Sequence, residues 1–184
     1  MRKKPRDEVA TFVVQDLRPE DYQEVPIDTE DHGTVLLRFS GGAKGVLLAC
    51  QVCAGRKNFI HFEINGTRKS IEWNGEEPNA MWVGQRGAPN SQLMKDPLVF
   101  APEAARYASV AAGLGEGYLD TFKNVFTDFH SWILSGQRMD TARAGFPTFL
   151  TGLSELEIVD AVLESAKRDR WVDVRSSVSS DEYL

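Results

Sequence analysis

The chain has 184 residues, of which 42% are hydrophobic and 26% are charged, as in a globular protein that buries one core. The formal net charge is -6 and the basic residues are scattered beyond Arg2, Lys3 and Lys4, so we expect no nucleic-acid partner. No run of about 18 apolar residues and no apolar signal segment is present, so we expect no membrane span and a cytoplasmic location.

Short runs of β-branched and aromatic residues predict strands in the first part of the chain. The connections contain glycine and asparagine in tight turns, so consecutive strands should pair antiparallel. The predicted strands are Val9–Val14, Thr34–Phe39, Gly45–Cys53, Phe59–Ile64, Ser70–Trp73 and Ala80–Val83. A long loop rich in Pro, Gly, Asn and Gln is expected over residues 84–112, with a short helical turn at 102–107.

Two long helices are predicted in the second part. Apolar residues recur at helical spacing between Gly117 and Ser135, and again between Thr148 and Lys167. Residues 170–174 are interpreted as a last short strand, and residues 176–184 as a frayed tail.

This order of elements predicts an α+β fold: an open, mostly antiparallel sheet with the two long helices packed on one face. The segments 35–37 and 46–50 are apolar on both sides, which indicates that both faces of these strands are buried. Since the helices cover one face, the other should meet a second domain or subunit. We expect residues 1–184 to form a single domain.

Cys50 and Cys53 form the lone C-x-x-C of the chain. A redox pair or half of a zinc site are the alternatives, but a redox pair is typical of a helix N-terminus and zinc needs four ligands. On a strand, an odd separation points the two sulfurs to opposite faces. We therefore expect buried structural thiols and no metal site.

Gly113, Gly115 and Gly117 precede a helix and suggest a phosphate-binding loop. The dinucleotide pattern needs its third glycine at position 118, which is a tyrosine, and a strand before the loop. We therefore expect no cofactor-binding residue in this chain. No nucleophile, paired carboxylates or histidine with a suitable partner stands out in the sequence, and no catalytic residue is assigned.

Arg56, Lys57 and Asn58 form the most informative polar cluster, because two cations and an amide lie together between two predicted strands. A surface turn is the plain interpretation. The alternative hypothesis is that these donors face a substrate or a partner chain, since Arg and Asn orient hydroxyl or phosphate oxygens well.

Several segments in a fixed order carry a resemblance to a known family. They include Gly42-Ala-Lys-Gly, Ser70-Ile-Glu-Trp, Glu116-Gly-Tyr-Leu-Asp-Thr-Phe-Lys-Asn and Phe146-Pro-Thr-Phe, with further segments at 28–39, 54–66, 78–84 and 170–174. Together they cover nearly all of residues 9–174, and the chain resembles the C-terminal domain of the Gfo/Idh/MocA oxidoreductases, relatives of glucose-fructose oxidoreductase and inositol dehydrogenase.

The resemblance implies an open antiparallel sheet with a free face for oligomer contacts. It also implies an N-terminal Rossmann domain that holds NAD(P), a Glu-Lys-Pro motif and an Asp-x-x-x-His pair, together with the start of the C-terminal domain; none of these is present in this sequence. Relatives often have a histidine where this chain has Leu114. No catalytic residue is therefore transferred to this chain.

Our leading hypothesis is the substrate-site and oligomerisation domain of an NAD(P)-dependent oxidoreductase that acts on a sugar, polyol or related hydroxy compound. The isolated chain is expected to be inactive and to bind no cofactor, with a homo-oligomer or a Rossmann-domain polypeptide as partner. The alternative is a non-catalytic binding or scaffolding module derived from the same family.

Overall fold

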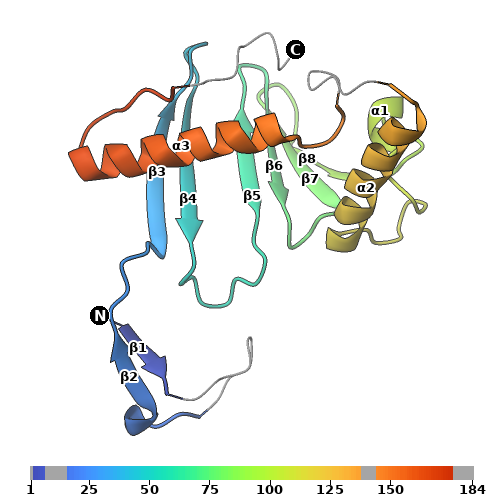
Figure 1. Cartoon of the computed structure of the whole chain (residues 1–184). Coiled ribbons are helices and arrows are strands. Elements are labelled where there is room, and N and C mark those ends of the chain that lie inside the picture. Colours follow the sequence, from blue (N-terminus) through green and yellow to red (C-terminus); the bar gives the residue numbers. More distant parts are fainter. Residues whose placement is uncertain (1, 7–15, 138–143, 176–184) are drawn as a thin grey trace. The chain divides into compact units, whose positions relative to one another are not determined.

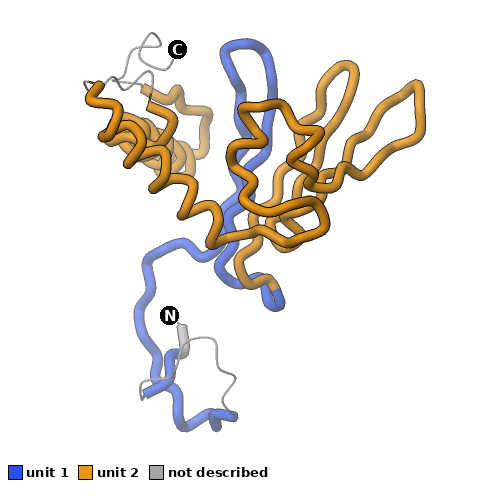
Figure 2. The backbone as a smooth tube through the Cα atoms, turned by 90° about the vertical axis from the view of Figure 1, so that its right-hand side faces the viewer, with its two compact units in different colours: residues 1–55 blue, residues 56–184 orange. Residues whose placement is uncertain are grey.

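The computed structural model describes residues 2–6, 16–137 and 144–175. The chain divides into two compact units, residues 1–55 and residues 56–184 (Figure 2). The expected single domain stays a prediction. The predicted strand Val9–Val14 and the predicted tail 176–184 lie outside the described residues.

Unit 1 contains two antiparallel strand pairs. Strand β1 (Arg2–Pro5) pairs with β2 (Tyr22–Val25), which follows a short 3-10 helix, η1 (Pro19–Asp21). Strand β3 (His32–Arg38) pairs with β4 (Lys44–Cys50), close to the predicted positions. The first pair was not predicted from the sequence.

The β3–β4 hairpin turns at a glycine in the left-handed region. Gly42 has φ +87, and its amide donates to the Phe39 carbonyl at 2.9 Å. Leu36 lies opposite Val46 in the register, and Thr34 lies opposite Leu48, so these side chains share one face. Leu36, Val46 and Leu48 are 60, 70 and 61% exposed. One face of the hairpin therefore presents large apolar side chains.

Unit 2 contains a four-stranded antiparallel sheet in the order β5-β6-β7-β8. The strands are β5 (His61–Asn65), β6 (Lys69–Asn74), β7 (Ala80–Gln85) and β8 (Ser91–Met94). The predicted loop over residues 84–112 was wrong in one part, because β8 pairs with β7 there. The short helical turn predicted at 102–107 is confirmed by helix α1 (Pro102–Ala105). A strand of four residues beginning Ser-Gln has too little apolar alternation to be detected.

The register of this sheet separates an apolar from a polar face. Phe62 lies opposite Trp73, and Ile64 lies opposite Ile71, whereas Glu63 lies opposite Glu72 on the other face. The predicted alternation of β5 therefore matches the observed faces. Val83, on the apolar face, is the one hydrophobic residue of the described part of the chain that is classed as buried, with 7% of its surface exposed.

The two long helices, α2 (Tyr118–Leu134) and α3 (Phe149–Arg168), match their predicted bounds within one residue at each end. The Thr148 side chain accepts a hydrogen bond from the Thr151 amide and caps α3. Asp169 ends the helix in the left-handed conformation, with φ 49. In Figure 1, α3 runs across one side of the sheet in front of β5 and β6.

The predicted final strand was wrong, since residues 170–175 have no regular secondary structure. The sequence there has strand-like composition, but no pairing partner is found in the described residues. The predicted fold class is confirmed: the chain is α+β, and its described residues form open antiparallel strands and three α-helices, two of them long (Figure 1). These elements bring several distant loops together in unit 2.

Candidate functional site

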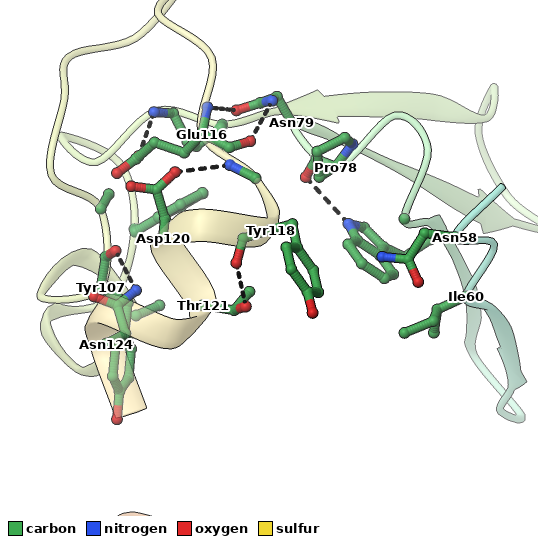
Figure 3. Close-up of a pocket in the computed structure, with 17 residues that line it drawn as sticks. Asn58, Ile60, Pro78, Asn79, Tyr107, Glu116, Tyr118, Asp120, Thr121 and Asn124 are labelled. Carbon is green, nitrogen blue, oxygen red and sulfur yellow. Dashed lines mark hydrogen bonds and ion pairs between the residues drawn. The ribbon is translucent and has the colours of Figure 1, made fainter. Parts of the chain in front are cut away.

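A cavity of about 370 Å³ lies within unit 2, between the end of β6 and the first turns of α2. Figure 3 shows Asn58 and Ile60 on one side of it and Thr121 and Asn124, from α2, on the other. The lining residues are Asn58, Ile60, Trp73, Gly75, Pro78, Asn79, Lys95, Phe100, Ala104, Tyr107, Ala108, Glu116, Gly117, Tyr118, Asp120, Thr121 and Asn124.

Trp73 and Tyr118 supply aromatic surface to this cavity. The indole Nε1 of Trp73 donates to the Pro78 carbonyl at 3.1 Å, which fixes the ring in place (Figure 3). Gly75 allows the backbone to approach Ile60 and the Trp73 ring, because a Cβ at this position would lie 3.0 Å from the Ile60 carbonyl oxygen and 3.3 Å from the ring. The aromatic wall is therefore held by the turn that follows β6.

The opposite end of the cavity is held by Asn79, which fastens the loop before α2. Its Nδ2 donates to the Glu116 carbonyl at 2.9 Å, and its Oδ1 accepts from the Glu116 amide at 3.0 Å. The Glu116 side chain pairs with the Lys95 ammonium at 2.5 Å and accepts from the Ser109 amide at 2.6 Å. Glu116 is thus contacted by Asn79 from the turn before β7, by Lys95 at the end of β8, and by Ser109 from the loop before α2.

Two carboxyl groups at this end have lowered pKa values. The hydrogen bond from Lys95 is the main cause for Glu116, strengthened by the Ser109 amide and opposed by burial. For Asp120 the main cause is the hydrogen bond from the Gly117 amide, with Lys123 as the second. Both carboxylates are therefore stabilised in the charged form.

A second hydrogen-bonded group supports the side of the cavity formed by α2. Asn124 donates to the Tyr107 carbonyl at 2.9 Å, and the Tyr107 hydroxyl donates to Asp128 at 2.8 Å. That hydrogen bond to Asp128 is the main cause of a raised Tyr107 pKa. Arg106 pairs with the same carboxylate at 3.0 Å. These contacts tie the segment after α1 to the middle of α2.

The glycine loop before α2 does not fit a dinucleotide. An anion at a helix N-terminus needs free backbone amides, but the Gly117 amide donates to Asp120 at 2.8 Å and the Glu116 amide donates to Asn79. Two carboxylates already stand at this position and would repel a pyrophosphate. The local geometry thus agrees with the reading of the sequence, in which these glycines feed a helix.

The three residues of the predicted polar cluster have different surroundings. Asn58 lines the cavity. Arg56 lies 4.0 Å from the centre of the Phe59 ring and pairs with Glu76 at 2.8 Å. The backbone amide of Lys57 donates to the same carboxylate at 3.4 Å. That all three face a substrate or a partner chain stays a prediction.

The expectation of buried free thiols was wrong, because Cys50 and Cys53 form a disulfide. Strand β4 ends at Cys50, and the chain turns over the next residues, which brings the two Cα atoms to 6.0 Å. The argument from opposite strand faces failed for this reason. Cys50 is half-buried and Cys53 is exposed.

Within the described ranges, no three His, Cys, Asp or Glu side chains are close enough together to hold a metal ion. His61, at the start of β5, contacts Glu72 at 3.0 Å across the strand pair.

None of the helices in the described part combines the length and the apolar character needed to cross a bilayer.

Sequence reasoning missed most residues of the cavity. Lys95 and Glu116 are 21 positions apart in segments without periodicity, and Asn79 is 37 positions from its partner. Asn79 and Glu116 do lie in two of the segments that carry the family resemblance, 78–84 and 116–124. That resemblance was the only available signal for their importance.

The comparisons with known proteins agree on one family. The model of the "Oxidoreductase family, C-terminal alpha/beta domain" of the Gfo/Idh/MocA proteins matches residues 4–174. Levoglucosan dehydrogenase of Pseudarthrobacter phenanthrenivorans is 32% identical over 152 residues, which is 81% of this chain and 37% of that protein.

Solved structures give the same result. An oxidoreductase from Sinorhizobium meliloti superposes with a TM-score of 0.73 at 29% identity, over 80% of this chain and 42% of that one. An inositol dehydrogenase homolog from Azotobacter vinelandii, solved with NADH and myo-inositol, gives a TM-score of 0.67 at 26% identity, over 78% and 39%. The chain spans about two fifths of the length of these relatives. It belongs to the Gfo/Idh/MocA oxidoreductase family and matches the C-terminal alpha/beta domain of that family.

Proposed function

We propose that this chain is the substrate-site and subunit-contact domain of an NAD(P)-dependent oxidoreductase that acts on a sugar, a polyol or a related hydroxy compound. The single observation that carries the proposal is the cavity beside α2, in a chain that belongs to this family. In the complete enzyme the cavity forms one wall of the substrate site.

The lining of the cavity supports a hydroxylated ligand. Trp73 and Tyr118 offer aromatic surface on which the C–H groups of a sugar ring pack. Asn58, Thr121 and Asn124 supply amide and hydroxyl groups, which both donate and accept hydrogen bonds. A mostly apolar lining with a few polar groups is the usual composition of a small-molecule site.

The relatives support the same class of ligand. One relative is a levoglucosan dehydrogenase, and another was solved with NADH and myo-inositol. Since the glycine loop before α2 does not fit a dinucleotide, the nicotinamide nucleotide would be held by another part of the complete enzyme. The isolated chain is accordingly expected to have no dehydrogenase activity.

The subunit-contact role rests on exposed apolar area. Leu36, Val46 and Leu48 lie together on one face of the β3–β4 hairpin and are more than half exposed. Burying each would contribute roughly 1.5–3 kcal/mol. A second copy of the chain is the proposed occupant of this face, as the family resemblance implies.

A chimeric enzyme tests the substrate-site role. The matching segment of levoglucosan dehydrogenase would be replaced by this chain, and NADH formation would be followed with levoglucosan and myo-inositol. We expect Trp73→Ala to lower kcat/KM at least about tenfold, because one aromatic platform contributes on the order of 1.4 kcal/mol or more.

Trp171→Ala is the matched control, since Trp171 does not line the cavity and should leave kcat/KM unchanged. An active chimera in which Trp73→Ala has no greater effect than Trp171→Ala would contradict the proposal.

A further inference from the structure

Each charged side chain that lines the cavity already has a charged partner. Lys95 is the only cation among the lining residues, and its ammonium lies 2.5 Å from Glu116 Oε2. The Lys95 and Glu116 side chains are 12 and 10% exposed, so water screens this pair weakly. Lys95 Nζ also donates to the Val110 carbonyl at 3.3 Å, which uses a second of its three protons.

The carboxylates of the cavity are occupied in the same way. Glu116 Oε1 accepts from the Ser109 amide at 2.6 Å, while Asp120 accepts from the Gly117 amide and from Lys123 at 3.2 Å. Lys123 itself does not line the cavity. The lining therefore offers no cation that lacks an anionic partner, and its two carboxylates outnumber its one ammonium, so a bound anion would meet a net negative charge.

The polar groups that remain are uncharged. Tyr118 carries a hydroxyl and Asn58 an amide, and both are exposed residues that line the cavity (Figure 3). The Thr121 hydroxyl donates to the Tyr118 carbonyl at 2.6 Å and offers a ligand its acceptor side. Such groups exchange hydrogen bonds with ligand hydroxyls without a net charge on either side. A phosphate or carboxylate would lose its hydration here and gain no charge-assisted hydrogen bond in return.

We infer that Glu116 is a specificity-determining residue: by neutralising Lys95 it makes the site select uncharged polyhydroxylated ligands and reject phosphorylated or carboxylated ones. This inference rests on the proposed function, because it concerns the ligand of the same cavity. It goes further by assigning the charge of the ligand, and by naming the residue that sets it.

The substitution Glu116→Gln reverses this selectivity. Glutamine retains the shape of glutamate and an oxygen that accepts from the Ser109 amide, but it leaves the Lys95 charge without its anionic partner. Removing one negative charge about 6 Å from a ligand anion changes the affinity for that anion roughly tenfold or more at effective dielectric constants of ~20–40. The affinity for a neutral ligand should change much less.

Ligand-detected NMR on the 184-residue chain measures this directly. Levoglucosan and myo-inositol are the neutral probes, and glucose 6-phosphate and gluconate are the anionic probes. The wild-type chain should bind at least one neutral probe and neither anionic probe, while Glu116→Gln should gain affinity for an anionic probe by about tenfold or more.

The double variant Lys95→Met with Glu116→Gln is the matched control. It removes both charges, so it should bind the neutral probe and lose the gained affinity for the anionic probe. Circular dichroism and unfolding curves of each variant establish that the comparison is made on folded protein.

Three results would overturn the inference, and they separate its failure from that of the proposed function. If the wild-type chain binds an anionic probe as well as the neutral one, or if Glu116→Gln folds and gains nothing, the charge selectivity is wrong while the proposed substrate site stands. If none of the probes binds any variant at millimolar concentration, the proposed substrate site fails and the inference falls with it.

Discussion

The side chain of Asn79 offers the sharpest test of how the cavity is built. Its amide makes two hydrogen bonds to the backbone of Glu116, which is 37 residues away, and both bonds are partly buried. Asn79→Ala leaves the backbone amide and the backbone carbonyl of Glu116 without their hydrogen-bond partner. Each lost hydrogen bond costs about 1 kcal/mol, and a partly buried group left without a partner adds to this, so the free energy of unfolding should fall by about 2–3 kcal/mol.

Urea unfolding measures the loss, and hydrogen exchange locates it. Protection of the backbone amides in residues 109–117 should fall in Asn79→Ala, because this loop is fastened there. Asn90→Ala is the matched control: the Asn90 side chain accepts one exposed hydrogen bond, from the Gln85 amide at 3.2 Å, and its loss should cost less than about 1 kcal/mol. Equal effects of the two substitutions would refute the reasoning.

Four further predictions follow from the structure. Reducing the Cys50–Cys53 disulfide should produce two titratable thiols and destabilise unit 1 by no more than about 2 kcal/mol, because the disulfide closes a loop of only four residues. A larger loss of unfolding free energy in urea would contradict this loop-closure argument. The Glu116 pKa is lowered from its ordinary value of 4.5, so the Glu116 carboxylate contributes to stability above that pH, and the contribution is lost as the pH falls through the folded pKa. Glu116→Gln should therefore make the free energy of unfolding less dependent on pH on the acid side. Calorimetric titration of the isolated chain with NADH and NADPH should show no micromolar binding, and such binding would disprove our interpretation of the glycine loop. Sedimentation at tens of micromolar should show a dimer or larger species that Leu48→Glu dissociates, whereas a monomeric wild-type chain would rule out the proposed contact face.

Local patterns in the sequence predicted the regular elements well. The apolar spacing around Phe122 and Phe126 predicted α2, and the alternation of β5 predicted its two faces, because both signals repeat within a few residues. Strand β8 was missed since a four-residue edge strand shows no period. The Cys50–Cys53 pairing was missed because it depends on where β4 ends.

The cavity depended on contacts that no local pattern reveals. Lys95 and Glu116 meet only after the sheet and the loop before α2 have formed, and neither residue stands out by composition. In the predicted polar cluster of residues 56–58, Asn58 lines the cavity, whereas the Arg56 side chain pairs with Glu76 and lies over the Phe59 ring. Turn composition places donors at the surface, but it does not tell which way each one points.

The Lys95–Glu116 pair also constrains how this domain can change during evolution. Removing one partner leaves a poorly solvated charge alone, which costs more than the intact pair contributes, so the single changes are disfavoured intermediates. Exchanging both for uncharged residues of similar volume carries no such cost. Among family members the two positions should therefore vary together, and a lineage that acquires an anionic substrate would be expected to lose the acid while it retains the lysine.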